Sequence, residues 1–88
     1  MQIPANELED VVKRLRRVEG QIGGIVRMID EGRECKDVVT QLSAASKAMS
    51  KASFAVISTG LRYCQLTDDA ETRESNMRDL ERLFLSLA

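Results

Sequence analysis

The chain has 88 residues, of which 43% are hydrophobic and 31% charged, and its formal net charge is −1. This length predicts one domain over residues 1–88. No stretch of about 18 apolar residues occurs, which excludes a transmembrane helix, and the N-terminal residues lack the basic and apolar regions of a secretory signal. We therefore expect a cytoplasmic protein that does not bind a membrane.

The first long helix is predicted over residues 7–31. Asn6 and Glu9 have the spacing of a capping box, in which each side chain accepts a hydrogen bond near the helix start. Apolar residues then recur at alternating intervals of three and four, the pattern of a heptad stripe. The stripe consists of Leu8, Val11, Leu15, Val18, Ile22, Ile25 and Ile29.

After a break at residues 30–32, the second helix is predicted from Arg33 or Glu34 to Cys64 or Gln65. Small residues such as Ala45 and Ala52 recur along it, so a partner helix can approach closely. The third helix is predicted over about residues 70–86, with N-caps available from residues 67–69. No internal repeat or low-complexity segment occurs.

Two long helices and one short helix define an all-α chain that cannot bury its own apolar stripe. Each long helix would be about 40 Å long, whereas a globule of this size has a radius of gyration of only about 12 Å. We therefore predict an antiparallel four-helix bundle made by two chains. The apolar surface left over indicates a homotetramer, a dimer of dimers.

The chain has two cysteines and no histidine. Cys35 and Cys64 fall near opposite ends of the second helix, roughly 40 Å apart. A disulfide needs Cα atoms within about 7 Å, so the two are expected to face each other only between antiparallel partner chains. The helix dipole favours a nucleophilic thiolate at Cys35, with Cys64 as the resolving thiol. The alternative is a pair of inert, buried thiols.

An enzyme is not expected, because the chain has no histidine base, no glycine-rich phosphate loop after a strand and no evident buried pair of acids. Two thiolates are too few for an ordinary zinc site. Cu(I) is a soft ion that tolerates fewer ligands. We therefore expect no cofactor, with Cu(I) bound by the two thiolates as the alternative.

Basic residues concentrate in the middle of the chain, where residues 11–62 carry a net charge of +5. Arg16 and Arg17 are predicted on the outward face of the first helix, with Arg14 beside the stripe. Lys47 and Lys51 form an outward i,i+4 pair on the second helix. Such residues can contact DNA phosphates without a recognition helix. A merely solvated helical face, or a structural adaptor without DNA, is the alternative.

Two segments carry a family resemblance. Residues 14–22, RLRRVEGQI, and residues 28–44, MIDEGRECKDVVTQLSA, resemble the copper-sensitive operon repressor family (CsoR/RcnR/FrmR type). The resemblance implies an all-α dimer of dimers that represses transcription by binding operator DNA, with inducer sites shared between subunits. It also implies that Arg14 and Lys51 occupy the positions most associated with DNA contact.

In copper-sensing members the resemblance implies three ligands: a Cys from one chain, and a His and a Cys four residues apart from the other. Cys35 and Cys64 match the two cysteines, whereas Gly60 replaces the histidine. This pattern is similar to the persulfide-sensing, CstR-like branch. It implies a repressor that releases DNA when persulfide or polysulfide donors crosslink Cys35 to Cys64 of the partner chain, with room at Gly60 for extra sulfur. The alternatives are a Cu(I)-responsive repressor and a regulator that responds to peroxide or other thiol oxidants.

Overall fold

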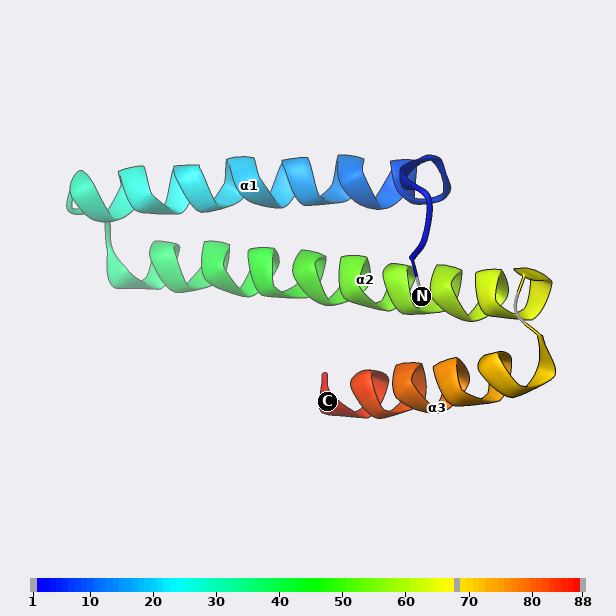
Figure 1. Cartoon of the computed structure of the whole chain (residues 1–88). Helices are drawn as coiled ribbons and strands as arrows, with labels where there is room; N and C mark the ends of the chain where they lie inside the picture. The colour runs from blue at the N-terminus through cyan, green and yellow to red at the C-terminus, as the bar shows by residue number, and fades with distance from the viewer. Residues whose placement is uncertain (1, 68, 88) are drawn as a thin grey trace. The chain divides into compact units, whose positions relative to one another are not determined.

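The protein is all-helical in the computed structural model, which describes residues 2–67 and 69–87 (Figure 1). A short 3-10 helix, η1 (Ala5–Leu8), is followed by the α-helices α1 (Glu9–Asp30), α2 (Cys35–Thr67) and α3 (Ala70–Ser86). No strand occurs among the described residues. The predicted all-α chain with two long helices and one short helix is therefore confirmed. Among the described residues, none of the helices combines the length and the hydrophobicity that a membrane span requires.

The start of α1 differs from the prediction. The chain first forms η1 behind Pro4, where the amide of Glu7 donates a hydrogen bond to the carbonyl of Pro4 at 3.0 Å. This three-residue bond is the mark of a 3-10 turn. Asn6 lies inside that turn, so the predicted capping box with Glu9 is wrong. The α-helix itself begins at Glu9, two residues later than expected.

The turn between α1 and α2 is a Schellman motif centred on Gly32. The amide of Gly32 donates to the carbonyl of Ile29 at 3.1 Å, and that of Arg33 donates to Met28 at 3.0 Å. Gly32 has φ +72°, a conformation that costs side-chain-bearing residues about 1–2 kcal/mol. This glycine ends α1 and sets Cys35 as the first residue of α2, one or two residues later than predicted.

The chain divides into two compact units. One, the α1–α2 unit, is Asp10–Ala52; the other, the α2–α3 unit, consists of the residues up to Glu9 and those from Ser53 onward. Helix α2 is continuous through both. The single domain predicted over residues 1–88 remains a prediction.

Within the α1–α2 unit, only part of the predicted stripe is buried. Val11, Val18 and Ile25 repeat every seven residues along α1 and are at most 6% exposed. The buried alanines of α2, Ala45 and Ala52, repeat at the same interval. The first part of α2 runs antiparallel to α1 here (Figure 1). Small side chains on α2 thus let the two helices pack closely.

A second set of apolar residues in this unit faces solvent. We call it the exposed stripe, and its members are between 39% and 60% exposed. It consists of Val12, Leu15, Ile22, Val26 and Ile29 on α1 and Val39, Leu42 and Met49 on α2. An apolar surface of this extent is typical of a protein–protein contact. It is what the predicted assembly requires, and the assembly remains a prediction.

In the α2–α3 unit, α3 runs back along the second part of α2 (Figure 1). Its bounds agree with the prediction. Asp69 is the N-cap, and its Oδ1 accepts a hydrogen bond of 2.7 Å from the amide of Thr72. This bond lowers the pKa of the Asp69 carboxyl below its ordinary value, because it favours the charged form. Leu80 is the buried apolar anchor of α3.

Candidate functional site

Cys35 is exposed at the start of α2 in the α1–α2 unit. The Gly32 turn positions it, and Arg33 pairs with Asp37 across the first helical turn at 3.8 Å. Leu42 and Met49 follow Cys35 at seven-residue intervals, so all three lie on nearly the same side of the helix. Cys35 therefore lies in line with the exposed stripe, on the surface available to a second chain.

Cys64 has the opposite environment. Its relative exposure is 0%, and it lies in the last turns of α2, inside the α2–α3 unit. Gly60, one turn earlier, is also buried. A thiol with this burial cannot react with a solute until the surrounding side chains move.

The space beside Gly60 is filled. A Cβ added at Gly60 would lie 3.3 Å from Cδ1 of Leu80 and 3.4 Å from Cδ1 of Ile3. Within a single chain, two apolar side chains therefore occupy the space beside Gly60, whereas room for extra sulfur atoms in a bridge between subunits remains a prediction. Sequence reasoning missed Ile3 altogether; an isolated apolar residue ahead of a proline carries no helical signal.

Both cysteines are thiols, one in each compact unit. Among the described residues, no three or more histidine, cysteine, aspartate or glutamate side chains gather in a way that could hold a metal ion. Gly60, at the position of the third ligand in the copper-sensing pattern, has no side chain that could bind a metal. Within the described residues, a single chain therefore shows no metal site made of three or more such side chains.

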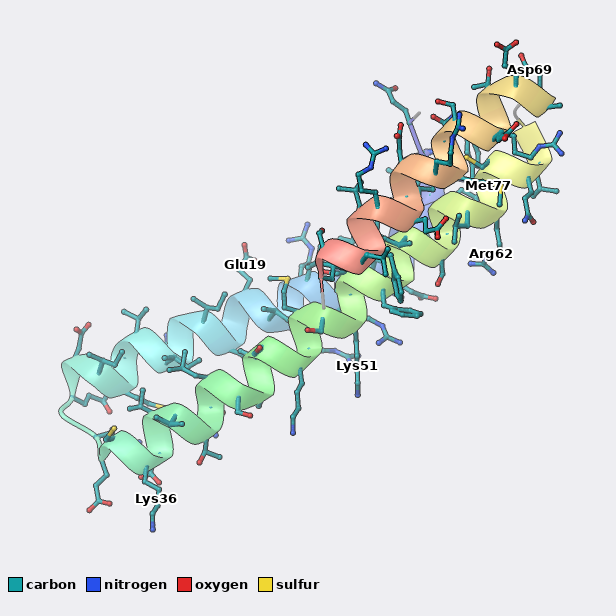
Figure 2. All side chains as sticks on the ribbon, turned by 90° about the horizontal axis from the view of Figure 1, so that it is seen from below. Glu19, Lys36, Lys51, Arg62, Asp69 and Met77 are labelled. Carbon is teal, nitrogen blue, oxygen red and sulfur yellow. The ribbon has the colours of Figure 1, made fainter. Side chains whose placement is uncertain are left out.

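The predicted DNA-contacting side chains are all exposed and all belong to the α1–α2 unit. They are Arg14, Arg16 and Arg17 on α1 and Lys47 and Lys51 on α2. In the described part of the chain, none of the five forms an ion pair, and Lys51 extends into solvent (Figure 2). Their charges are thus available to phosphates. Whether they contact DNA remains a prediction.

Comparison with known proteins matches these features to one family. A sequence profile described as "Metal-sensitive transcriptional repressor" matches residues 7–86. The copper-sensing transcriptional repressor RicR of Mycobacterium tuberculosis is 45% identical over 56 residues, 64% of this chain and 58% of RicR. This chain thus spans less than two thirds of the length of RicR.

A second relative is matched over more of its length. The copper-sensing transcriptional repressor CsoR of Bacillus subtilis is 29% identical over 84 residues, 91% of this chain and 83% of CsoR. Both relatives are transcriptional repressors, a class without enzymatic activity, in agreement with the sequence prediction. The profile covers nearly the whole chain, from Glu7 in η1 to the end of α3. The chain therefore belongs to the metal-sensitive transcriptional repressor family.

Proposed function

We propose that this chain is a DNA-binding repressor whose operator affinity falls when reactive sulfur species link Cys35 to Cys64 of the partner subunit. The observation that carries the proposal is the thiol pair itself. Cys35 is exposed in line with the exposed stripe, and one turn before Cys64 there is a packed glycine instead of a third metal ligand. Family membership supports the repressor role.

The exposed stripe supports the assembly. Eight large apolar side chains of one unit remain in solvent in the single chain. Pairing with a second chain would bury them, at roughly 25 cal/mol per Å² of apolar surface removed from water. When two α2 helices run antiparallel, Cys35 at the start of one comes opposite the end of the other, where Cys64 lies. Each sensor is then shared by two subunits.

The chemistry needs no metal and no separate oxidant. The Cys35 thiolate attacks the outer sulfur of a persulfide RSSH, releasing the thiol RSH and leaving Cys35–S–SH. The Cys64 thiolate of the partner subunit then attacks the Cys35 sulfur, expels HS⁻ and closes a disulfide. With a longer polysulfide on Cys35, attack on the next sulfur expels HS⁻ and leaves a trisulfide.

The burial of Cys64 links this chemistry to a change of shape. Because the thiol is fully covered, it can attack only after side chains of the α2–α3 unit move aside. The bridge would then hold the rearranged state. A coupling of about 1–3 kcal/mol weakens DNA binding by about 5–150-fold per linked event.

DNA binding would use the basic side chains of the α1–α2 unit. Arg14, Arg16 and Arg17 lie on α1, and Lys47 and Lys51 on α2, all exposed. Contacts of this kind are made to phosphates and depend strongly on salt. The choice of operator sequence would then depend on the spacing of these basic side chains in the assembly and on the shape of the DNA duplex.

The test combines mass spectrometry with DNA binding. We expect treatment with an organic tetrasulfide to produce inter-chain Cys35–Cys64 species, some heavier by one sulfur, together with loss of binding to the chain's own upstream DNA. Cys35→Ser should bind DNA and ignore the treatment, and Cys64→Ser should accumulate persulfide without crosslinking. A treated wild-type protein that keeps full DNA affinity would refute the proposal.

A Cu(I)-responsive repressor is the second candidate, because RicR and CsoR carry copper sensing in their names. The site would be the same two thiolates, Cys35 and Cys64 from different subunits. Competition for Cu(I) against a strong chelator separates the two candidates. Tight binding of one Cu(I) per thiol pair, with loss of DNA affinity, would favour copper over reactive sulfur.

A further inference from the structure

A polar pocket of about 290 Å³ lies between the last turns of α1 and the first turns of α2, entirely inside the α1–α2 unit. Gln21 and Arg27 line it from α1, Glu31 and Arg33 from the turn, and Gln41 from α2. Its volume is at the lower end of the range for small-molecule sites. The pocket therefore suits a small metabolite, and its walls carry charge of both signs.

The pocket lies on the side of the unit away from the exposed stripe. On α1, Gln21 lies about 60° to one side of the buried Val18, whereas Ile22 of the stripe lies about 40° to the other side. On α2, Gln41 of the pocket and Leu42 of the stripe are likewise neighbours in sequence, about 100° apart around the helix. A second chain that covers the exposed stripe would therefore leave the pocket open to solutes.

One wall of the pocket holds a buried hydrogen-bond acceptor that the protein does not satisfy. The side-chain oxygen Oε1 of Gln21 is buried and accepts no hydrogen bond from any described residue. An unpaired buried polar atom destabilises a fold, and nearly all such atoms in native proteins have a partner. An exception at the wall of a pocket points to a ligand group that donates a hydrogen bond there.

Two guanidinium groups line the same pocket. That of Arg27 lies back along α1, with Nη1 and Nη2 each 3.8 Å from the positions that a Cβ would take at Gly23 and Gly24. Among the described residues, Arg27 forms no ion pair. Arg33 pairs with Asp37 at 3.8 Å, but both side chains are about half exposed, so this contact is weak. Both guanidinium groups are thus available to a carboxylate.

We infer that the pocket binds a free α-amino acid. The carboxylate of the ligand would pair with Arg27 and Arg33, whose planar donors match a carboxylate in shape. Its ammonium group would donate a hydrogen bond to Oε1 of Gln21 and would be attracted by the carboxylate of Glu31. One small zwitterion thus satisfies the unpaired acceptor and complements both signs of charge.

A phosphate group fits this pocket less well than an amino acid does. A DNA phosphodiester has no proton to donate to Gln21, and Glu31 would repel it. Ile25 and Met28 also line the pocket and offer apolar contact to an aliphatic side chain. The site is therefore distinct from the predicted DNA-contacting residues. It goes beyond the proposed function, because it would let an amino acid act on a chain whose sensor thiols are elsewhere.

The first test titrates amino acids by calorimetry and follows the thermal midpoint. The ligand would join α1, the turn and α2, so binding should raise the midpoint as its concentration rises. We expect binding of at least one of L-alanine, L-leucine and L-methionine. The N-acetyl form of that amino acid lacks the ammonium and its amide lacks the carboxylate, so each should bind at least about tenfold more weakly. No binding of any of the three amino acids overturns the inference.

Inorganic phosphate, a bare oxyanion, is the competitor in the same experiment. It should not displace the amino acid at equal concentration. Displacement by phosphate, or binding of the N-acetyl form as tightly as of the free amino acid, would show an anion site and overturn the inference. The Cys35→Ser/Cys64→Ser protein should bind the amino acid as the wild type does, so failure of the proposed sulfur chemistry leaves this test intact.

The second test removes the unpaired acceptor. Gln21→Met keeps the length of the side chain, so we expect it to weaken amino-acid binding at least about tenfold while raising the urea midpoint of the free protein. Arg27→Ala should also abolish binding, and Arg27→Lys should be intermediate, because it keeps the charge but not the planar fork. Arg82→Ala removes the same charge in the other unit and is the control. Circular dichroism checks that each variant keeps its helices, and a Gln21→Met protein that binds like Arg82→Ala overturns the inference.

Discussion

Gly60→His tests whether this position is a vacant ligand site or part of the core. A Cβ alone would lie 3.3 Å from Leu80 and 3.4 Å from Ile3, so an imidazole ring must displace at least one of these side chains. Exposing Leu80 costs about 1.5–3 kcal/mol. A ring nitrogen buried without a partner adds about 1–3 kcal/mol. The better helix propensity of histidine returns a few tenths of a kcal/mol. We therefore expect Gly60→His to lower the free energy of unfolding by about 2–5 kcal/mol.

Urea unfolding followed by circular dichroism measures this loss. Gly60→Ala is the matched control: its small contact strain opposes a propensity gain of about 1 kcal/mol, so its stability should stay close to wild type. The double variant Gly60→His/Leu80→Ala removes the obstructing side chain and should be less destabilised than the sum of its single changes. If Gly60→His unfolds at the wild-type urea concentration, the packing described around Gly60 is wrong.

Three further predictions concern the cap, the basic face and the thiols. The hydrogen bond from Thr72 lowers the pKa of the Asp69 carboxyl in the folded chain. The cap therefore stabilises the fold fully above the ordinary carboxyl pKa, about 4, and this stabilisation is lost as pH falls through the lowered pKa of the folded state. The thermal midpoint of the wild type should therefore drop more steeply below pH 4 than that of Asp69→Asn, and equal slopes would contradict this. Arg14→Ala and Lys51→Ala should each weaken binding to all DNA sequences by a similar factor. In an anisotropy titration, each should also reduce the slope of log affinity against log salt concentration by about 1. An unchanged slope would show that the substituted side chain does not contact a phosphate. Because Cys64 is fully buried, we expect it to react with iodoacetamide only as urea unfolds the chain. Peptide mapping measures its labelling, with the exposed Cys35 as the comparison in the same sample. Labelling of Cys64 in the folded protein as fast as in the unfolded chain would contradict its burial.

The burial of Cys64 has a consequence for any inducer. Under the proposed function, a sensor with one exposed and one buried thiol would react in two stages, first at Cys35 on the surface and then at Cys64 after the α2–α3 unit opens. Reagents that modify only Cys35 should leave the rearrangement incomplete. A donor that supplies bridging sulfur, or an ion that draws two thiolates together, completes it. From the proposed function we therefore expect inducers that join the two thiols to release DNA more effectively than reagents that modify only one of them.

Helix boundaries in this chain follow mostly from local sequence. Gly32 ends α1 because it adopts φ +72° at no steric cost. Asp69 begins α3 because its side chain satisfies the amide of Thr72. Each of these effects involves residues within one or two turns, so periodicity and cap chemistry were sufficient to predict them. The start of α1 was misplaced because Pro4 supports a 3-10 turn before the α-helix, a distinction that cap patterns do not make.

The sequence by itself determined three helices, an apolar stripe too large for one chain to bury and a thiol near each end of α2. Only the tertiary structure decided that Cys35 is open while Cys64 is covered, and that Gly60 packs against Leu80 and Ile3. The physical reason is the distance along the sequence over which each effect acts. Helix formation depends on neighbours three and four residues away, whereas the burial of a thiol depends on side chains brought together from distant parts of the chain, whose positions no local pattern encodes.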